Sequence, residues 1–221
     1  MAINKEAYQQ IINELKEHQV TLVAVSKTKP ATDILELYQL GQRDFGENYV
    51  QELVDKAVQL PKDIRWHFIG HLQSNKVKYI SPFVHLIHGV DSFKLLREIN
   101  KQAAKLNRVM DVLLQIYIAQ EETKFGLDEI ELHALIKNFE YNQMPYVRII
   151  GLMGMASFSV DKERARTEFR KLKTILDNLR PAAPGSELPT LSIGMSSDYK
   201  IAIEEGSTMV RIGSILFGTR N

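Results

Sequence analysis

Short apolar runs rich in β-branched residues alternate along the chain with longer segments in which apolar residues recur at helical spacing. This alternation is typical of parallel strands joined by crossover helices. We predict eight strands, at Thr21–Ser26, Asp44–Gly46, Arg65–Gly70, Val84–Val90, Asp111–Ile118, Arg148–Met155, Thr190–Gly194 and Met209–Gly213. The second run is the weakest, because Phe45 is its single large apolar residue, and we accept it because the segments on both sides have helical spacing.

The segments between the predicted strands carry signals for the start of a helix. These signals are Pro30 at a first-turn position, Asp91 and Asp161 as N-caps, and Asp128 and Glu129 early in a helix that runs to about Glu140. A further amphipathic helix is expected over residues 1–19, and the Pro/Gly-rich residues 181–189 are expected to form a connecting loop. The pattern predicts an α/β fold, a single (β/α)8 TIM barrel with an extra N-terminal helix, with residues 1–221 as one domain.

Composition narrows the classes of function. The 221 residues include 28 Lys and Arg against 27 Asp and Glu, so no long-range field favours nucleic acid or an anionic membrane. The absence of cysteine excludes disulfides and thiolate chemistry and is compatible with a reducing compartment. No apolar run approaches the roughly 20 residues of a membrane span, and the charged N-terminal helix is unlike a signal peptide. We therefore expect a cytoplasmic protein.

A lysine stands where the first predicted strand ends, in the sequence VAVSKTKP over residues 23–30. Catalytic groups of TIM barrels lie at this C-terminal end of the strands. A partly desolvated lysine keeps more of its amine neutral, and the neutral amine can attack a carbonyl to form an imine. Lys27 is the candidate, whereas Lys29 directly precedes Pro30 and is expected to face solvent. Taken alone, both lysines could also be solvated loop residues.

The last two predicted strands supply the residues of an anion site. Loops after strands seven and eight commonly bind phosphate in these barrels, through backbone N–H groups and small hydroxyls. Gly213 and Ser214 follow strand eight, and the sequence LSIGMSSD over residues 191–198 places further hydroxyls after strand seven. Ser197 or Asp198 could alternatively serve only as a helix cap.

Arg211 interrupts the apolar run of the eighth strand, and a charged arginine inside a barrel mouth requires a partner. A pyridine nitrogen is one candidate, and a strand carboxylate such as Glu47 is the other. An arginine donor would keep a pyridine nitrogen unprotonated, which makes the ring a weaker electron sink than a carboxylate partner would.

Together these residues resemble the pyridoxal phosphate homeostasis proteins, the YggS/PROSC group, whose barrel is similar to the N-terminal barrel of alanine racemase. The resemblance runs in order over nearly the whole chain. The matching stretches are AVSKTKP (24–30), FGENYVQE (45–52), WHFIGHLQSNK (66–76), KFGL (124–127), GLMGMA (151–156), LSIGMSSD (191–198) and GSTMVRIGSILFG (206–218).

The resemblance implies a fold-type III barrel that holds pyridoxal 5′-phosphate (PLP) as a Schiff base on Lys27, with Arg211 facing the pyridine nitrogen. The other implied contacts are Ser196, Gly213 and Ser214 to the phosphate, Asn48 beside the ring and Met195 as a wall. It further implies a monomer that carries or buffers PLP in intracellular vitamin B6 homeostasis without efficient catalysis. Its partners would be PLP, other B6 vitamers and apo PLP-dependent enzymes.

Two enzyme classes remain as alternatives. A PLP-dependent amino-acid racemase needs an acid and a base on opposite faces of the substrate carbon, and racemases of this architecture take a tyrosine from a second domain. This chain ends at Asn221, so we expect no second domain, although Tyr49 or Tyr199 could lie near the mouth. A phosphosugar isomerase or aldolase with its imine on Lys27 would be colourless, whereas a PLP protein would be yellow.

Several other sequence features do not indicate a functional site. His67 and His71 are four residues apart and His85 and His88 three apart, but no acidic ligand lies close in sequence, so we predict no metal site. Trp66 is expected in the core. The stretch over residues 162–173 mixes basic residues with glutamates, which is typical of a solvated helix face.

Overall fold

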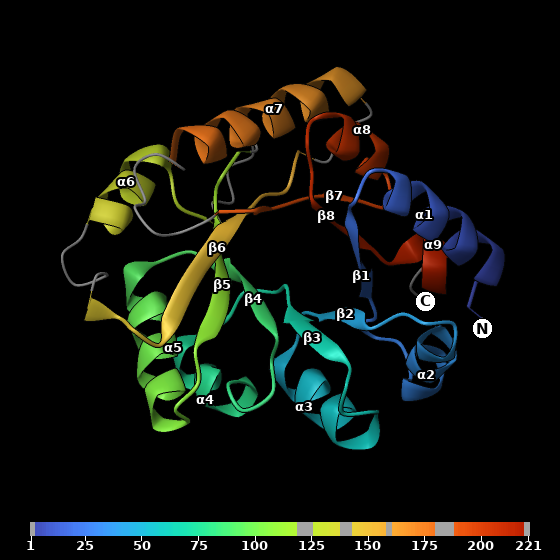
Figure 1. The fold of residues 1–221 in the computed structure, drawn as a ribbon, viewed down its shortest axis with the longest axis horizontal. Coiled ribbons are helices and arrows are strands. Elements are labelled where there is room, and N and C mark those ends of the chain that lie inside the picture. Colours follow the sequence, from blue (N-terminus) through green and yellow to red (C-terminus); the bar gives the residue numbers. More distant parts are fainter. Residues whose placement is uncertain (1–2, 119–125, 138–142, 158–160, 180–187, 219–221) are drawn as a thin grey trace.

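The computed structural model describes residues 3–118, 126–137, 143–157, 161–179 and 188–218. Eight parallel strands close into a barrel in chain order, with β1 hydrogen-bonded to both β2 and β8. The strands are β1 (Thr21–Val25), β2 (Asp44–Glu47), β3 (Arg65–Phe68), β4 (Leu86–Val90), β5 (Met110–Gln115), β6 (Val147–Met153), β7 (Thr190–Met195) and β8 (Met209–Ile212). The predicted (β/α)8 barrel is therefore confirmed (Figure 1).

The helices lie around the outside of the strands (Figure 1). They are α1 (Lys5–Glu17), α2 (Ala31–Gln39), α3 (Val50–Gln59), the 3-10 turn η1 (Ser74–Lys76), α4 (Val77–Ile80), α5 (Phe93–Lys105), α6 (Glu129–Lys137), α7 (Lys162–Leu179), α8 (Tyr199–Glu204) and α9 (Ser214–Phe217). The predicted N-terminal helix is α1, and the Asn4 N–H donates to the Leu216 carbonyl at 2.8 Å, which joins it to α9. None of these helices is both long and apolar enough to cross a membrane.

The weak second strand forms as predicted, and all four residues of β2 are buried. Its glycine explains how so short a strand packs against its neighbours. A Cβ on Gly46 would lie 2.9 Å from Val23 and 3.1 Å from Ile69, so a larger residue would push the strands apart. Trp66 on β3 is 3% exposed and lies in the core, which confirms the prediction for this residue.

Two of the predicted helix starts need correction. Asp91 is not the N-cap of α5, because Ser92 takes that position and its hydroxyl accepts a hydrogen bond from the Leu95 N–H at 3.3 Å. Pro30 stands at the N-cap of α2 and not inside its first turn. A proline suits this boundary because it cannot donate a backbone hydrogen bond.

The other two predicted starts are confirmed. Asp128 accepts from the Glu131 N–H at 2.8 Å and donates its own N–H to the Glu131 carboxylate at 2.9 Å, which is a reciprocal capping box. Asp161 directly precedes α7 and accepts from the Glu163 N–H at 3.0 Å. The expected end of α6 near residue 140 and most of the loop over residues 181–189 lie outside the described residues.

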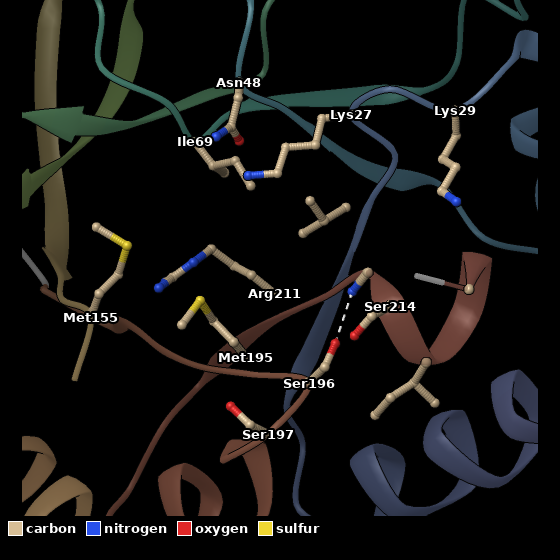
Figure 2. A pocket seen from close by; sticks show the side chains of 14 residues that line it. Lys27, Lys29, Asn48, Ile69, Met155, Met195, Ser196, Ser197, Arg211 and Ser214 are labelled. Carbon is tan, nitrogen blue, oxygen red and sulfur yellow. Dashed lines mark hydrogen bonds between the residues drawn. The ribbon is translucent and has the colours of Figure 1, made fainter. Parts of the chain in front are cut away.

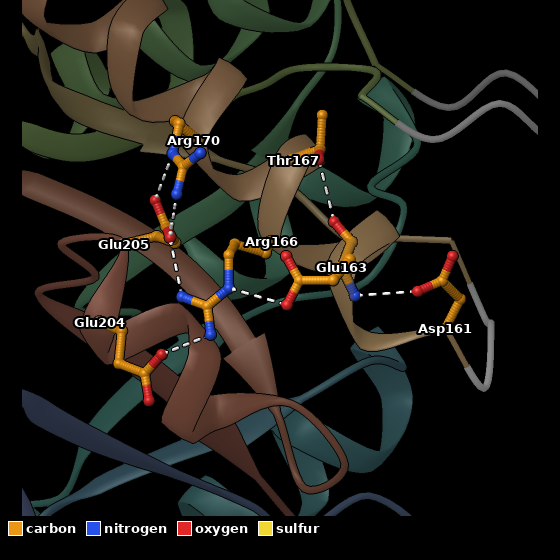
Figure 3. Close-up of polar contacts among 7 residues, drawn as sticks. All are labelled: Asp161, Glu163, Arg166, Thr167, Arg170, Glu204 and Glu205. Carbon is orange, nitrogen blue, oxygen red and sulfur yellow. Dashed lines mark hydrogen bonds and ion pairs between the residues drawn. The ribbon is translucent and has the colours of Figure 1, made fainter.

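The sequence indicated a solvated helix face over residues 162–173, but basic residues of α7 are paired with carboxylates. Arg166 pairs with Glu204 at 2.6 Å and with Glu205 at 2.9 Å, and Arg170 also reaches Glu205 at 2.9 Å (Figure 3). The hydrogen bonds that Arg166 donates to Glu204 and Glu205 raise the pKa of its guanidinium. These ion pairs attach α7 to α8, so the arginines are already paired with carboxylates of the same chain.

Candidate functional site

A cavity of about 530 Å³ opens at the carboxyl ends of the strands, where TIM barrels carry their chemistry (Figure 2). The cavity is lined by residues at or just after the carboxyl ends of β1, β2, β3, β6, β7 and β8, which lie far apart in the sequence. All seven residues that the sequence singled out line it: Lys27, Asn48, Met195, Ser196, Arg211, Gly213 and Ser214. The structure thus brings the predicted set together, while their roles toward a cofactor stay predictions.

The two lysines of the β1–α2 loop point in different directions. The Lys27 side chain extends across the cavity toward Asn48 and Ile69, whereas the Lys29 side chain points away from Lys27 (Figure 2). Between them Thr28 has φ +64°, a left-handed conformation that is uncommon for a β-branched residue. This turn separates two lysines that would otherwise lie on the same side of an extended segment.

A buried polar cluster, which we call the loop anchor, lies beneath this turn and consists of Ser26, Glu47, Glu52 and Lys56. The Lys56 ammonium donates to the Ser26 carbonyl at 2.8 Å and to one carboxylate oxygen of both Glu47 and Glu52 at 2.7 Å. The Ser26 hydroxyl donates to Glu47 at 2.6 Å, and the Thr28 N–H donates to Glu52 at 2.6 Å. The loop anchor therefore holds the residues on both sides of Lys27 in the sequence, Ser26 and Thr28.

Sequence reasoning missed the loop anchor. Its available signal was the i, i+4 spacing of Glu52 and Lys56 on one helix. Burial raises the pKa of Glu47 despite the opposing charge of Lys56. Its Oε2 atom is buried without a hydrogen-bond partner among the described residues. Glu47 is thus paired with Lys56, which rules out the alternative that it forms a salt bridge with Arg211.

Arg211 projects from β8 and is 5% exposed. Its Nη1 donates to the Ser192 carbonyl at 2.7 Å and to the Ser192 hydroxyl at 2.6 Å, and its Nη2 donates to the Gly154 carbonyl at 2.9 Å. Burial lowers the pKa of Arg211 to about 10, against a smaller opposing effect of Asp198, so the guanidinium stays charged at neutral pH. An arginine has five N–H donors, so three hydrogen bonds to described residues leave two for a ligand.

The opposite end of the cavity is rich in small donors. Ser196 accepts a hydrogen bond from the Gly213 N–H at 3.2 Å, which ties the β7 and β8 loops together (Figure 2). Ser214 and Ile215 occupy the first turn of α9, where backbone N–H groups have no intrahelical acceptor. Asp198 stands at the N-cap of α8, but its side chain accepts from the Met195 N–H at 2.6 Å and makes no capping bond.

The lining residues fit an anionic, aldehyde-bearing aromatic ligand such as PLP. Three lining side chains are cationic (Lys27, Lys29 and Arg211), and the described lining contains no carboxylate. Met155 and Met195 supply apolar, polarisable surface for a ring. The Asn48 Oδ1 atom is buried without a hydrogen-bond partner among the described residues, so this site retains an unused acceptor.

Neither tyrosine proposed as a racemase base lines the cavity. The Tyr199 hydroxyl donates to Glu14 on α1 at 3.0 Å, and burial together with this bond raises its pKa to about 12. Tyr49 is 57% exposed at the N-cap of α3. The Tyr199 hydroxyl is therefore directed to α1 and not into the cavity.

The histidines group differently from their spacing in the sequence. In the barrel interior His67 Nδ1 lies 2.9 Å from His88 Nε2, and His67 Nε2 lies 3.0 Å from Asp44 Oδ1. His71, in contrast, is half-exposed beside Asp91. Potential ligand atoms of Asp44, His67 and His85 lie within 4.8 Å of one another. Arg65 donates to both oxygens of Asp44, so a guanidinium already neutralises the only carboxylate of this group. That charge disfavours a metal cation.

Comparison with known proteins agrees with this geometry. Residues 3–221 match the family described as alanine racemase, N-terminal domain. The chain is 45% identical over 206 residues to the pyridoxal phosphate homeostasis protein of Aquifex aeolicus, covering 92% of this chain and 89% of that protein. The human pyridoxal phosphate homeostasis protein is 38% identical over 235 residues, covering 100% of this chain and 85% of that protein.

The chain belongs to the family of pyridoxal phosphate homeostasis proteins. Among solved structures, PipY of Synechococcus elongatus PCC7942, with PLP bound, is 36% identical, with a TM-score of 0.89 over 96% of this chain and 99% of that chain. Clostridium difficile alanine racemase shares the fold at 18% identity and a TM-score of 0.77, and its match covers 61% of that longer chain. The predicted family and barrel class are both confirmed.

Proposed function

We propose that this protein binds PLP as a Schiff base on Lys27 and carries or buffers it in intracellular vitamin B6 homeostasis. The observation that carries the proposal is the placement of the Lys27 amine in one cavity with Arg211 and the hydroxyl and N–H groups after β7 and β8. The likeness to PipY, whose structure contains PLP, supports it.

Each group has a distinct role in this proposal. Ser196, Ser214 and the amides around Gly213 bind the phosphate, and Lys27 provides the primary amine for the aldehyde. Arg211 offers its two remaining N–H groups to the pyridine nitrogen. Bound PLP supplies an electron-withdrawing ring, and an arginine donor keeps that ring a weak electron sink.

Carriage is favoured over catalysis by the composition of the cavity wall. Racemisation requires a second acid or base across the substrate carbon from Lys27. Among the described lining residues no tyrosine, histidine or carboxylate is available, and Lys29 points away from Lys27 (Figure 2). This arrangement supports binding and release more than proton transfer.

The same proposal extends to the ligands, partners, location and assembly of the protein. The protein binds other phosphorylated B6 vitamers through the same phosphate contacts, although less tightly when they lack an aldehyde for Lys27. It delivers PLP to apo PLP-dependent enzymes. It functions in the cytoplasm as a monomer, and residues 1–221 form one domain.

Titration with PLP tests the proposal directly. Wild-type protein and the matched control Lys29→Ala should develop the visible absorption of a PLP Schiff base, and Lys27→Ala should not. A colourless wild-type protein would favour the phosphosugar enzyme and refute the PLP proposal.

Carriage is tested by supplying the loaded protein to an apo-enzyme and measuring recovered activity. The same preparation is assayed against a panel of D- and L-amino acids. Turnover at ordinary enzyme rates of about 1 to 10³ per second would contradict the carrier function.

A further inference from the structure

The barrel interior contains a continuous chain of polar side chains, which we call the interior relay: Arg211, Ser192, His88, His67 and Asp44. TIM-barrel interiors are normally filled by branched aliphatic residues. Here Ser192 and His88 are fully buried and His67 is 1% exposed, beside an apolar cluster that includes Val23 and Leu113. Buried polar groups are costly unless they are hydrogen-bonded, so a set that crosses the barrel indicates a function.

The relay crosses between opposite sides of the barrel. The Ser192 hydroxyl on β7 lies 3.1 Å from His88 Nδ1 on β4, 104 residues earlier in the sequence. His88 Nε2 lies 2.9 Å from His67 Nδ1, and His67 Nε2 lies 3.0 Å from Asp44 Oδ1. One end, Arg211, lines the candidate PLP cavity, and the other end lines a second cavity of about 200 Å³ where the strands begin.

With both imidazole rings neutral, the donors and acceptors of these groups give every hydrogen bond of the relay one direction. Arginine can only donate, so the Ser192 oxygen accepts from Arg211 and its single hydrogen is directed to His88 Nδ1. Burial lowers the pKa of His88 well below its usual value, so this ring is neutral and carries its proton on Nε2. His67 Nδ1 must then accept, which leaves its Nε2–H to donate to Asp44.

The relay ends at a carboxylate that stays charged. Burial by itself would raise the pKa of Asp44, but hydrogen bonds from His67 and Arg65 outweigh it and lower the pKa to about 2. The hydrogen bonds thus run from the guanidinium at the PLP cavity through Ser192, His88 and His67 to the carboxylate at the opposite end.

We propose that Ser192 and His88 are positioning residues for Arg211, and that the relay to Asp44 fixes the orientation of the guanidinium toward the ring of bound PLP. The inference rests on the proposed function, because the effect of orientation is read through PLP. Ser192 supplies two of the three hydrogen bonds of Arg211, and His88 determines where the Ser192 hydrogen points. Without the Ser192 hydroxyl the guanidinium keeps its charge and its two backbone carbonyl acceptors, but it loses the side-chain contact that ties it to the relay.

Substitutions next to Arg211 give the strongest expected effect. Ser192→Ala and His88→Phe should each weaken PLP binding about tenfold, since each leaves a buried donor or acceptor unpaired beside the ring-facing cation. They should also shift the visible absorption of the PLP-saturated protein, which a purely structural role would not do. Ser192→Thr keeps the hydroxyl and should restore both properties.

The Asp44 end of the relay offers a matched pair of substitutions that lie outside the PLP cavity lining. Asp44 and Asp111 line the same small cavity, and each accepts two hydrogen bonds from an arginine, Arg65 and Arg148 respectively. Only Asp44 belongs to the relay. Asp44→Asn should shift the absorption of bound PLP in the same direction as Ser192→Ala, and Asp111→Asn should match wild type.

A second measurement needs no PLP. Nitrogen NMR of the apo protein should show His88 as a neutral ring protonated on Nε2. A different tautomer at His88, wild-type spectra and affinities in Ser192→Ala and Asp44→Asn, or an equal shift in Asp111→Asn would overturn the relay. Wild-type protein that takes up no PLP would instead refute the proposed function, so the two failures are distinguishable.

Discussion

Replacement of Lys56 by methionine tests how strongly the loop anchor holds the turn that carries Lys27. The Lys56 side chain is 7% exposed, its partner Glu47 is fully buried, and all three ammonium donors are used. Methionine keeps most of the volume but leaves the Glu47 carboxylate without a counter-charge. Breaking a buried pair in this way should lower the free energy of unfolding by about 3–5 kcal/mol.

The measurement is urea denaturation of the apo protein at neutral pH, with Lys5→Met as the matched control. Lys5 pairs with Glu36 at the same 2.7 Å, but the two side chains are 58% and 33% exposed. This exposed pair should contribute only about 0–1 kcal/mol. Adding Glu47→Gln to Lys56→Met removes the unpaired charge and should recover part of the lost stability.

The deficit of Lys56→Met should also depend on pH. Burial raises the pKa of Glu47 above its usual 4.5, and removing Lys56 raises it further. A raised carboxyl pKa means that the folded state binds the extra proton, so this contribution to stability is present at low pH and is lost as pH rises above 4.5. The difference from wild type should therefore shrink on acidification. Equal losses in the two lysine variants, or a deficit independent of pH, would refute the reasoning.

Two further predictions concern other parts of the barrel. Gly70→Ala should lose more stability than Gly41→Ala and should weaken PLP binding. A Cβ on Gly70 would lie 2.3 Å from the Asn48 carbonyl oxygen, whereas a Cβ on Gly41 meets no atom within 4 Å and costs only the backbone strain of φ +104°; equal melting temperatures would contradict this. The pKa of Asp44 is lowered from 3.8 to about 2, so the folded state gains about 2 kcal/mol of stability from this carboxylate above pH 3.8 and loses it as pH falls toward 2. In acid denaturation Asp44→Asn should lack this loss of stability. An acid profile identical to wild type would contradict the assignment.

The sequence was sufficient for the barrel and for the set of residues at its mouth. Strand period, flanking turn residues and helix starts are local signals, so each predicted run contains a strand, including the short β2. Lys27 and Gly213 could be placed at the mouth because carboxyl ends of parallel strands always share one face of a barrel. The error at Asp91 arose because Ser92, one residue later, is an equally good N-cap.

The polar interior could not be derived in the same way. The His88 contact with Ser192 joins residues 104 positions apart, and which of several buried polar groups meet depends on the register and shear of the closed sheet. The spacing of His67 and His71 gave no indication that His67 meets His88, because that contact joins β3 to β4 and depends on which side chains the strands direct inward. The same reason hid the pairing of Glu47 with Lys56, which crosses from β2 to α3.

The central claim is that the amine of one particular lysine holds PLP. Borohydride reduction of the PLP-loaded protein, followed by peptide mapping, identifies that amine directly. The account predicts a single reduced pyridoxyl adduct on Lys27, which extends across the cavity toward Asn48 (Figure 2). An adduct on Lys29, or no adduct despite bound PLP, would contradict it.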